Sequence, residues 1–402
     1  MKKIEGINEL KQMMGTYYLQ AKNAKHNDEK VCWITSGAPV ELLIAFDVIP
    51  VYPENYAAMC GATKMGGQLA QVAEDKGFSP DICSYFRIDI GQTEIQGGPI
   101  MGLPEPDFLF SANNICGTVI KWYEEQSRHW NKPCYFMDIP FLYGEVEPST
   151  INYVVTQMKE MIPFLEEQTG KKFDEEKFFN VLQEAERASM YWRELLDQCA
   201  SRPAPMSSFD SFFLMGPIVT LRGTTECAEF YKRLLDEMKQ RVADGESVIE
   251  NEQYRLLWDN IPMWFATKAV SRAFAEYNAV FVAATYTASW AISRPFTEGD
   301  PWEAMAENYI VPYINRGFEK RLDILAELME RFRADWIVFH SARSCKAYSI
   351  GQYDLKEALT ARTGKPGLVI EGDIADERMY SEAQVNTRIE AFMEALHAGR
   401  GA

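Results

Sequence analysis

The feature that most constrains this chain is a strand that ends in a polar loop, after which a cysteine opens a helix. In DFLFSANNICGTVIKW, Phe108 to Phe110 form an apolar run of strand type, and Cys116 precedes residues with helical spacing. The pattern recurs at Cys345 in DWIVFHSARSCKAYS and at Cys83 in SPDICSYF. A helix N-terminus favours the thiolate, which is the form that binds metal or attacks. The pattern therefore predicts three cysteines with related positions in an α/β fold.

Strand-like and helical segments alternate near both ends of the chain. VCWIT, VIPVY and PCYFMDIP read as strands in the first third, and AVFVAATYT, WIVFHS and GLVIEG read as strands in the last third. Such alternation with helices is typical of parallel, doubly wound sheets. The middle third instead carries apolar residues at helical spacing. The sequence thus predicts two doubly wound α/β domains and a largely helical middle segment.

The length of 402 residues favours two or three domains. We expect an N-terminal helical arm over 1–30 and a first α/β domain over 31–150. A mostly helical segment over 151–265 and a second α/β domain over 266–402 complete the division. The loop GEVEPST marks the change from alternating to helical character.

The charge balance argues against nucleic-acid and membrane partners. Lys and Arg total 41 against 58 Asp and Glu, which gives a net charge of -17 without an evident basic patch. A cleft on such a protein can still be locally positive, so an anionic small molecule stays open. The most apolar stretch, APVELLIAFDVIPVY, is interrupted by Glu41, Asp47 and Pro50, and the N-terminus has no apolar signal core. We expect a cytoplasmic protein.

Four of the eight cysteines have a structural interpretation, and Cys60 stays open between two roles. Cys199 and Cys227 lie on apolar helical stripes, and Cys32 and Cys134 lie inside strands where a small buried side chain fits. For Cys60, in AAMCGA, we favour packing near a helix end. Disulfides are not expected in a chain of this size without a signal peptide.

Cys83, Cys116 and Cys345 differ because each lies at an element junction beside small polar residues. In doubly wound folds, ligands bind in the crevice at the carboxyl ends of the strands. A structural role and a shared metal site both remain open for these three residues. The chain has no CxxC pair, which argues against zinc ribbons and ferredoxin-type sites. Three dispersed thiolates would suit a four-iron, four-sulfur (4Fe-4S) cluster whose fourth iron is free to bind water or substrate.

Two further polar residues follow strands and are candidates for the same crevice. Ser36 follows VCWIT and Glu54 follows VIPVY. Ser36 could instead cap a helix before Pro39, and Glu54 could be a solvated loop carboxylate. In the functional interpretation, Glu54 donates or accepts a proton near the metal, and Ser36 is a hydrogen-bond partner in the same crevice. The Gly-rich segment GQTEIQGGPIMG matches neither a dinucleotide-binding nor a P-loop fingerprint.

Three motifs carry a family resemblance. YPEN at 52–55, NNICGTVIKWYE at 113–124 and RSCKAYSIGQYDL at 343–355 resemble the 2-hydroxyacyl-CoA dehydratase and benzoyl-CoA reductase family. The order of elements is similar over nearly the whole chain, about 31–396. Within the family, the chain looks most like the larger, alpha-type cluster subunit of the dehydratase component.

The resemblance implies two flavodoxin-like domains and one oxygen-sensitive 4Fe-4S cluster. Carried over residue by residue, the cluster ligands are Cys83, Cys116 and Cys345, with Ser36 and Glu54 on the substrate side. The implied reaction removes water from an (R)-2-hydroxyacyl-CoA and gives the 2-enoyl-CoA. It proceeds through a ketyl radical anion, which lets the hydroxyl leave and makes the β-hydrogen acidic.

The resemblance also implies partners. These are the acyl-CoA substrate, a related smaller iron-sulfur subunit that completes a heterodimer, and a separate ATP-hydrolysing iron-sulfur activator that injects one electron. The absence of a P-loop from this sequence agrees with ATP being hydrolysed elsewhere.

Two alternatives within the family stay open. MGPIVTLRGTTECAEFY and the SIGQ after Cys345 also resemble a component of an ATP-dependent benzoyl-CoA reductase. A double-cubane-type cluster reductase would need more than three cysteine ligands, for which Cys60 or Cys134 are the candidates. The sequence decides neither the acyl group of the substrate nor whether a flavin is bound.

Overall fold

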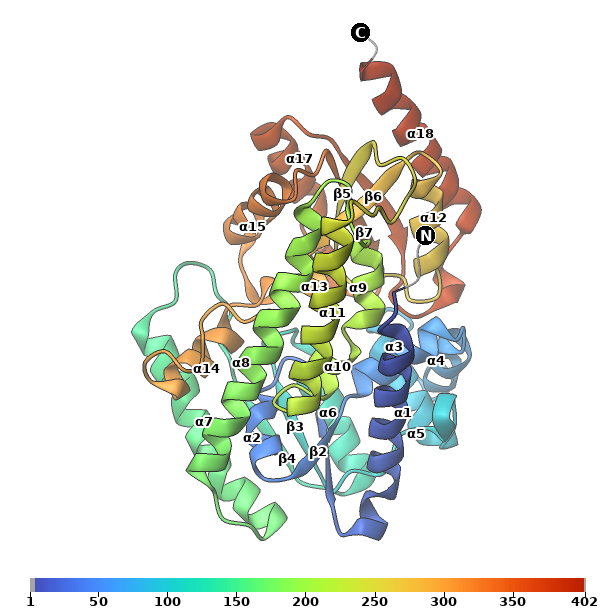
Figure 1. Cartoon of the computed structure of the whole chain (residues 1–402). Coiled ribbons are helices and arrows are strands. Elements are labelled where there is room, and N and C mark those ends of the chain that lie inside the picture. The colour runs from blue at the N-terminus through green and yellow to red at the C-terminus, as the bar shows by residue number, and fades with distance from the viewer. Residues whose placement is uncertain (1–3, 401–402) are drawn as a thin grey trace.

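A computed structural model describes residues 4–400 and contains two four-stranded parallel sheets connected by long helices (Figure 1). This confirms the predicted α/β class with two doubly wound sheets. The extreme ends of the expected N-terminal arm and of the expected second α/β domain, residues 1–3 and 401–402, lie outside the described residues. Within that range, no helix is long and apolar enough to cross a membrane.

The first sheet has the strand order β2-β1-β3-β4. Its central strand β1 aligns Cys32 with Phe108 of β3, and Lys30 of β1 pairs with Val48 of β2. The central strands are apolar and buried, as expected for a parallel sheet with helices on both faces. The elements of this lobe are β1 (Lys30–Ile34), α2 (Val40–Ala45), β2 (Val48–Val51), α3 (Pro53–Ala62), α4 (Gly66–Asp75), α5 (Ser84–Ile95), β3 (Phe108–Ala112), α6 (Thr118–Trp130) and β4 (Cys134–Met137).

The second sheet has the order β6-β5-β7-β8. Its elements are β5 (Tyr254–Asp259), α12 (Thr267–Ala275), β6 (Ala279–Ala284), α13 (Thr285–Ala288), α14 (Pro301–Ile310), α15 (Phe318–Arg331), β7 (Trp336–Ala342), α16 (Lys346–Ser349), α17 (Gln352–Thr363), β8 (Gly367–Gly372) and α18 (Glu382–Arg400). Strand β5 was not among the strands predicted from the sequence. It lies within 151–265, the range expected to be mostly helical, and is a central strand of this sheet. The proposed domain boundaries stay a prediction.

Strand β5 was missed because its sequence, YRLLWD, begins and ends with polar or charged residues. Arg255 is fully buried nonetheless. Its guanidinium donates to the carbonyl oxygens of Phe332 at 2.8 Å and Ser201 at 3.0 Å, and it also pairs with Glu252. These contacts compensate the buried positive charge of Arg255, which would otherwise make it unfavourable to bury β5 in the core.

The helices of the middle third run alongside both sheets (Figure 1). They are α7 (Pro148–Thr169), α8 (Glu175–Asp197), α9 (Ser208–Leu214), α10 (Gly216–Thr220) and α11 (Thr225–Ala243), and α1 (Ile7–Asn23) packs against α10. Helix α8 contacts α2 of the first lobe. The Trp192 indole of α8 also donates to the Thr287 carbonyl of the second lobe at 3.0 Å. The helical segment therefore bridges the two sheet-containing lobes.

Direct polar contacts also join the two lobes. Arg87 of α5 forms a 2.9 Å ion pair with Asp376, and both side chains are fully buried. Nearby, the Ser84 N–H donates to Ser344 Oγ at 3.1 Å, and Ser344 donates to Asp373 at 2.5 Å. These contacts hold the first turns of α5 against the loops that follow β7 and β8.

Candidate functional site

The three cysteines singled out in the sequence all precede helices. Cys116 lies in the loop between β3 and α6, and Cys345 lies between β7 and α16. Cys83 is the residue immediately before α5. Two of the loops thus follow the carboxyl ends of central strands, one from each sheet, where doubly wound folds place their ligands.

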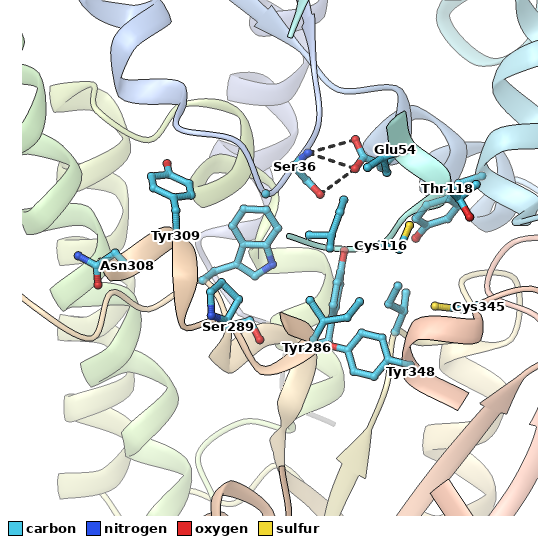
Figure 2. A pocket seen from close by; sticks show the side chains of 18 of the residues that line it. Ser36, Glu54, Cys116, Thr118, Tyr286, Ser289, Asn308, Tyr309, Cys345 and Tyr348 are labelled. Atoms are coloured by element: carbon cyan, nitrogen blue, oxygen red, sulfur yellow. Dashed lines mark hydrogen bonds between the residues drawn. The ribbon is translucent and has the colours of Figure 1, made fainter. Parts of the chain in front are cut away.

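Two neighbouring cavities meet at these cysteines. The inner cavity has a volume of about 140 Å³, and its walls include Ser36, Glu54 and all three thiols. The outer cavity has a volume of about 1300 Å³ and is also lined by Cys83, Cys116 and Cys345. Figure 2 shows Cys116 and Cys345 at the same end of the inner cavity. The fold therefore brings the three cysteines together from positions far apart in the chain.

Burial dominates the chemistry of the three thiols. It raises the pKa of Cys83 and Cys116, and it raises the pKa of Cys345 to about 12. The pKa of Cys83 is raised further by the neighbouring Cys345 and Cys116. Backbone N–H groups at the helix starts oppose these shifts but do not outweigh burial. The sequence expectation that helix N-termini would favour the thiolates is thus reversed, and the thiolates need a cationic partner.

The donor set fits a cluster better than a single metal ion. Within residues 4–400, no three His, Cys, Asp or Glu side chains are grouped closely enough to hold one ion. An iron-sulfur cluster instead binds each thiolate through a different iron and so accepts more widely spaced sulfurs. Three thiols line a common space, and the pKa values of Cys83 and Cys345 are raised by neighbouring cysteines of this set, which matches that requirement.

The other five cysteines lie away from this space. Cys32, Cys60, Cys199 and Cys227 are buried, and Cys134 is half-buried in β4. None of them lines the inner or the outer cavity among the described residues. Cys60 and Cys134 are therefore not positioned to act as additional ligands at this site.

Ser36 and Glu54 form a hydrogen-bonded pair on the wall of the inner cavity (Figure 2). The Ser36 backbone N–H donates to both carboxylate oxygens at 3.1 and 3.2 Å, and Ser36 Oγ donates at 3.0 Å. Ser36 does not cap α2, whose N-cap is Pro39. Glu54 is only 6% exposed, and burial raises its pKa to about 7. It is therefore a buried group that can exchange a proton near neutral pH.

A second polar cluster in the inner cavity was missed by the sequence analysis. Arg222 Nε donates to Glu41 at 3.0 Å, and Tyr309 OH donates to the other Glu41 oxygen at 2.5 Å. Arg222 also donates to Tyr309 OH at 2.5 Å. The available signal was Glu41 itself, because a carboxylate in the apolar helix VELLIA requires a buried partner.

The outer cavity is locally positive. Its basic residues Arg316, Arg321 and Lys346 have no carboxylate ion pair within the described chain. Lys121 and Arg128, also in this wall, are neutralised by Glu124 and Glu125. Asp81 is the remaining carboxylate of the wall, so the basic side chains still outnumber the acidic ones. An anionic ligand can therefore be attracted here even though the net charge of the chain is -17.

Comparison with known proteins gives consistent results over nearly the full length. The family model described as 2-hydroxyglutaryl-CoA dehydratase, D-component, matches residues 35–396. The chain is 34% identical to the (R)-2-hydroxyisocaproyl-CoA dehydratase alpha subunit of Clostridioides difficile, over 97% of this chain and 95% of the relative. It is 33% identical to the (R)-phenyllactyl-CoA dehydratase alpha subunit of Clostridium sporogenes, over 98% of both. It is 30% identical to one subunit of the benzoyl-CoA reductase of Thauera aromatica, over 97% and 94%.

The raised pKa of Glu54 predicts a pH-dependent stability. The folded protein holds the Glu54 proton up to about pH 7, whereas an unfolded glutamate loses it near pH 4.3. The folded state thus binds more protons between these values, and its free energy of unfolding should fall by about 3 kcal/mol from pH 5 to pH 8 through this residue. Denaturant unfolding at both pH values should show a smaller fall for Glu54→Gln than for the native protein or the exposed control Glu226→Gln. Equal falls in all three would contradict the assignment.

Proposed function

This chain belongs to the 2-hydroxyglutaryl-CoA dehydratase D-component family, and on that premise we propose that it is the alpha-type iron-sulfur subunit of an (R)-2-hydroxyacyl-CoA dehydratase. Such an enzyme removes water from a 2-hydroxyacyl-CoA and forms the 2-enoyl-CoA. One observation carries the proposal: three cysteines and the Ser36–Glu54 pair face a single inner cavity. Family membership alone would not require that convergence.

Cys83, Cys116 and Cys345 are the residues that would hold a 4Fe-4S cluster. Bound there, such a cluster supplies a low-potential electron and an iron that no cysteine of this set occupies. The walls of the inner cavity are mainly apolar, with Ile115, Ile261 and Ile374 among them. These side chains exclude water from a reaction that passes through a radical.

Glu54 and Ser36 provide the acid-base chemistry. Dehydration takes a hydroxide from C2 and a proton from C3, which leave together as water. A carboxyl group with a pKa of about 7 can donate its proton to the departing hydroxide and then, as the carboxylate, accept the C3 proton, which restores its starting state. The Ser36 N–H and Oγ donate to the Glu54 carboxylate and fix its orientation in the cavity wall.

The outer cavity is the proposed site of the coenzyme A portion. Its volume of about 1300 Å³ is large enough for an extended cofactor. Arg316, Arg321 and Lys346 provide positive charge for the phosphates. The cysteines lie where the two cavities meet, which places the thioester between the coenzyme on one side and the acyl group on the other.

We propose two protein partners for this subunit. They are a related smaller iron-sulfur subunit, which forms the heterodimer, and an ATP-dependent iron-sulfur activator. Exposed apolar side chains around the outer cavity support a covering partner, since such patches mark interfaces: Phe141, Tyr143, Phe318 and Ile350. Co-purification in equal amounts would check the heterodimer, and a lone, active chain would exclude it.

The cluster assignment predicts the behaviour of Cys116→Ser. This variant should fold but lose most of its iron and acid-labile sulfide, because a serine hydroxyl is a poor ligand for a soft metal. Iron content and visible absorbance after anaerobic purification measure the effect. The matched control is Cys134→Ser, a half-buried cysteine outside both cavities, which should retain its iron. Unchanged iron in Cys116→Ser would show that the cluster lies elsewhere.

The proton-transfer role predicts that Glu54→Gln keeps its iron but loses turnover by about 100-fold or more. The assay is anaerobic dehydration by the chain with its partner and activator, using a panel of 2-hydroxyacyl-CoA and aryl-CoA thioesters. Formation of enoyl-CoA supports the proposed function. Reduction of benzoyl-CoA without any dehydration would favour the benzoyl-CoA reductase alternative, and full activity of Glu54→Gln would remove Glu54 from the mechanism.

The coenzyme site predicts an effect on KM. Arg316→Gln should raise the KM for the acyl-CoA by about 10-fold with little change in kcat, because one charge contact to a phosphate is lost before chemistry begins. Arg272→Gln removes the same charge from an exposed position of α12, outside both cavities, and should leave KM unchanged. Equal KM values for the two variants would argue against coenzyme binding in the outer cavity.

A further inference from the structure

The inner cavity has two distinct ends. Figure 2 shows Cys116 and Cys345 at one end and Tyr309 and Asn308 at the other. If the thioester reacts beside the cysteines, as the proposed function requires, the acyl side chain extends toward Tyr309. The residues around that end then determine which acyl groups fit.

At the end near Tyr309, the polar side chains already form hydrogen bonds within the protein. Ser289 Oγ donates to the Thr285 carbonyl at 2.9 Å. The Asn308 amide donates to the Arg294 carbonyl at 2.7 Å, and its oxygen accepts from Ser293 at 2.9 Å. Trp290 packs on the same Arg222 guanidinium as Tyr309. It belongs to the chain segment whose aliphatic and aromatic residues also line the cavity: Ala291, Ile292 and Phe296. This surface favours an apolar side chain.

Arg222 is the one cation in the described wall of the inner cavity, and it is already neutralised. Glu41, which is fully buried, accepts from Arg222 and from Tyr309. The guanidinium also lies 5.9 Å from the Trp290 ring centre and 5.7 Å from that of Tyr309. A second carboxylate on the substrate would find no unpaired cation, and burying such a charge is strongly unfavourable.

The cavity volume limits the size of the acyl group. The inner cavity measures about 140 Å³, and an apolar protein cavity of about 150 Å³ admits benzene. We propose that the enzyme acts on 2-hydroxyacyl thioesters with an uncharged, branched aliphatic or phenyl side chain. We also propose that the Glu41–Arg222 pair excludes side chains that carry a second carboxylate. This inference rests on the proposed function and specifies its substrate class.

The first test is substrate discrimination by the native protein with its partner and activator. The kcat/KM for 2-hydroxyisocaproyl-CoA and for phenyllactyl-CoA should exceed that for 2-hydroxyglutaryl-CoA by about 100-fold or more. Equal or better use of 2-hydroxyglutaryl-CoA would overturn the inference while leaving the proposed function intact.

Binding of unreactive analogues separates the inference from the proposed function. Isocaproyl-CoA and glutaryl-CoA lack the hydroxyl and cannot be dehydrated. Calorimetry should show isocaproyl-CoA binding at least about 10-fold more tightly than glutaryl-CoA, because only the latter brings a second carboxylate. Equal affinities would refute the neutral acyl pocket. Tight, selective binding without dehydration of any substrate would instead refute the proposed function.

Two variants test the wall itself. Glu41→Gln frees Arg222 and should raise the kcat/KM for 2-hydroxyglutaryl-CoA relative to phenyllactyl-CoA by about 10-fold. The matched control Glu226→Gln removes an exposed charge and should not change this ratio. An unchanged ratio in Glu41→Gln would overturn the role of the ion pair.

Ala291→Leu keeps the inference testable even if Glu41→Gln does not fold. It adds three carbon atoms to the wall of the inner cavity. It should lower the kcat/KM for phenyllactyl-CoA by about 10-fold while sparing lactoyl-CoA. The control Ala383→Leu makes the same change at an exposed site on α18. Equal effects on both substrates would contradict an acyl pocket at this position.

Discussion

The site depends on a buried ion pair between the two lobes. Arg87 and Asp376 are both fully buried and lie 2.9 Å apart. Arg87 is one helical turn after Cys83, and its backbone N–H donates to the Cys83 carbonyl at 3.1 Å. Removing one partner of such a pair costs about 3–5 kcal/mol. The pair therefore fixes Cys83 of the first lobe relative to Cys345 of the second, which a single lobe could not do.

Close backbone packing supports this contact. A Cβ on Gly66 would collide with the carbonyl oxygen of Ala375, and one on Gly61 would lie 3.0 Å from the Ala375 Cα. Helices α3 and α4 can thus approach the loop after β8 only because these positions are glycine. Glu54 lies in the first turn of α3, and Asp376 follows β8. The same close approach therefore sets the distance between Glu54 and the interface of the lobes.

Sequence predicted those parts of the site that follow from strand ends. Strands β1 and β2 pair in parallel, with Trp33 opposite Val51, so Ser36 and Glu54 had to emerge at the same edge of the sheet. Arg222 and Glu41 could not be paired in this way, because 181 residues separate them and the two elements meet only through the helical segment. The pKa direction of the cysteines was missed for a related reason. A helix start is visible in sequence, but the depth of burial that outweighs it is a property of the assembled lobes.

In the proposed function, the two cavities divide substrate recognition by physical character. The outer cavity attracts through charge that is not neutralised locally, whereas the inner cavity selects through shape and through the absence of a free charge. Electrostatic attraction extends over several ångströms and does not require an exact position of the ligand. Steric fit, in contrast, depends on van der Waals contact. The phosphates of an acyl-CoA would thus bind in the outer cavity before its acyl side chain contacts the walls of the inner cavity. The residues proposed to contact the acyl side chain lie toward Tyr309, away from Cys116 and Cys345. Substitutions of these residues can therefore change which acyl group binds without disturbing the cysteines.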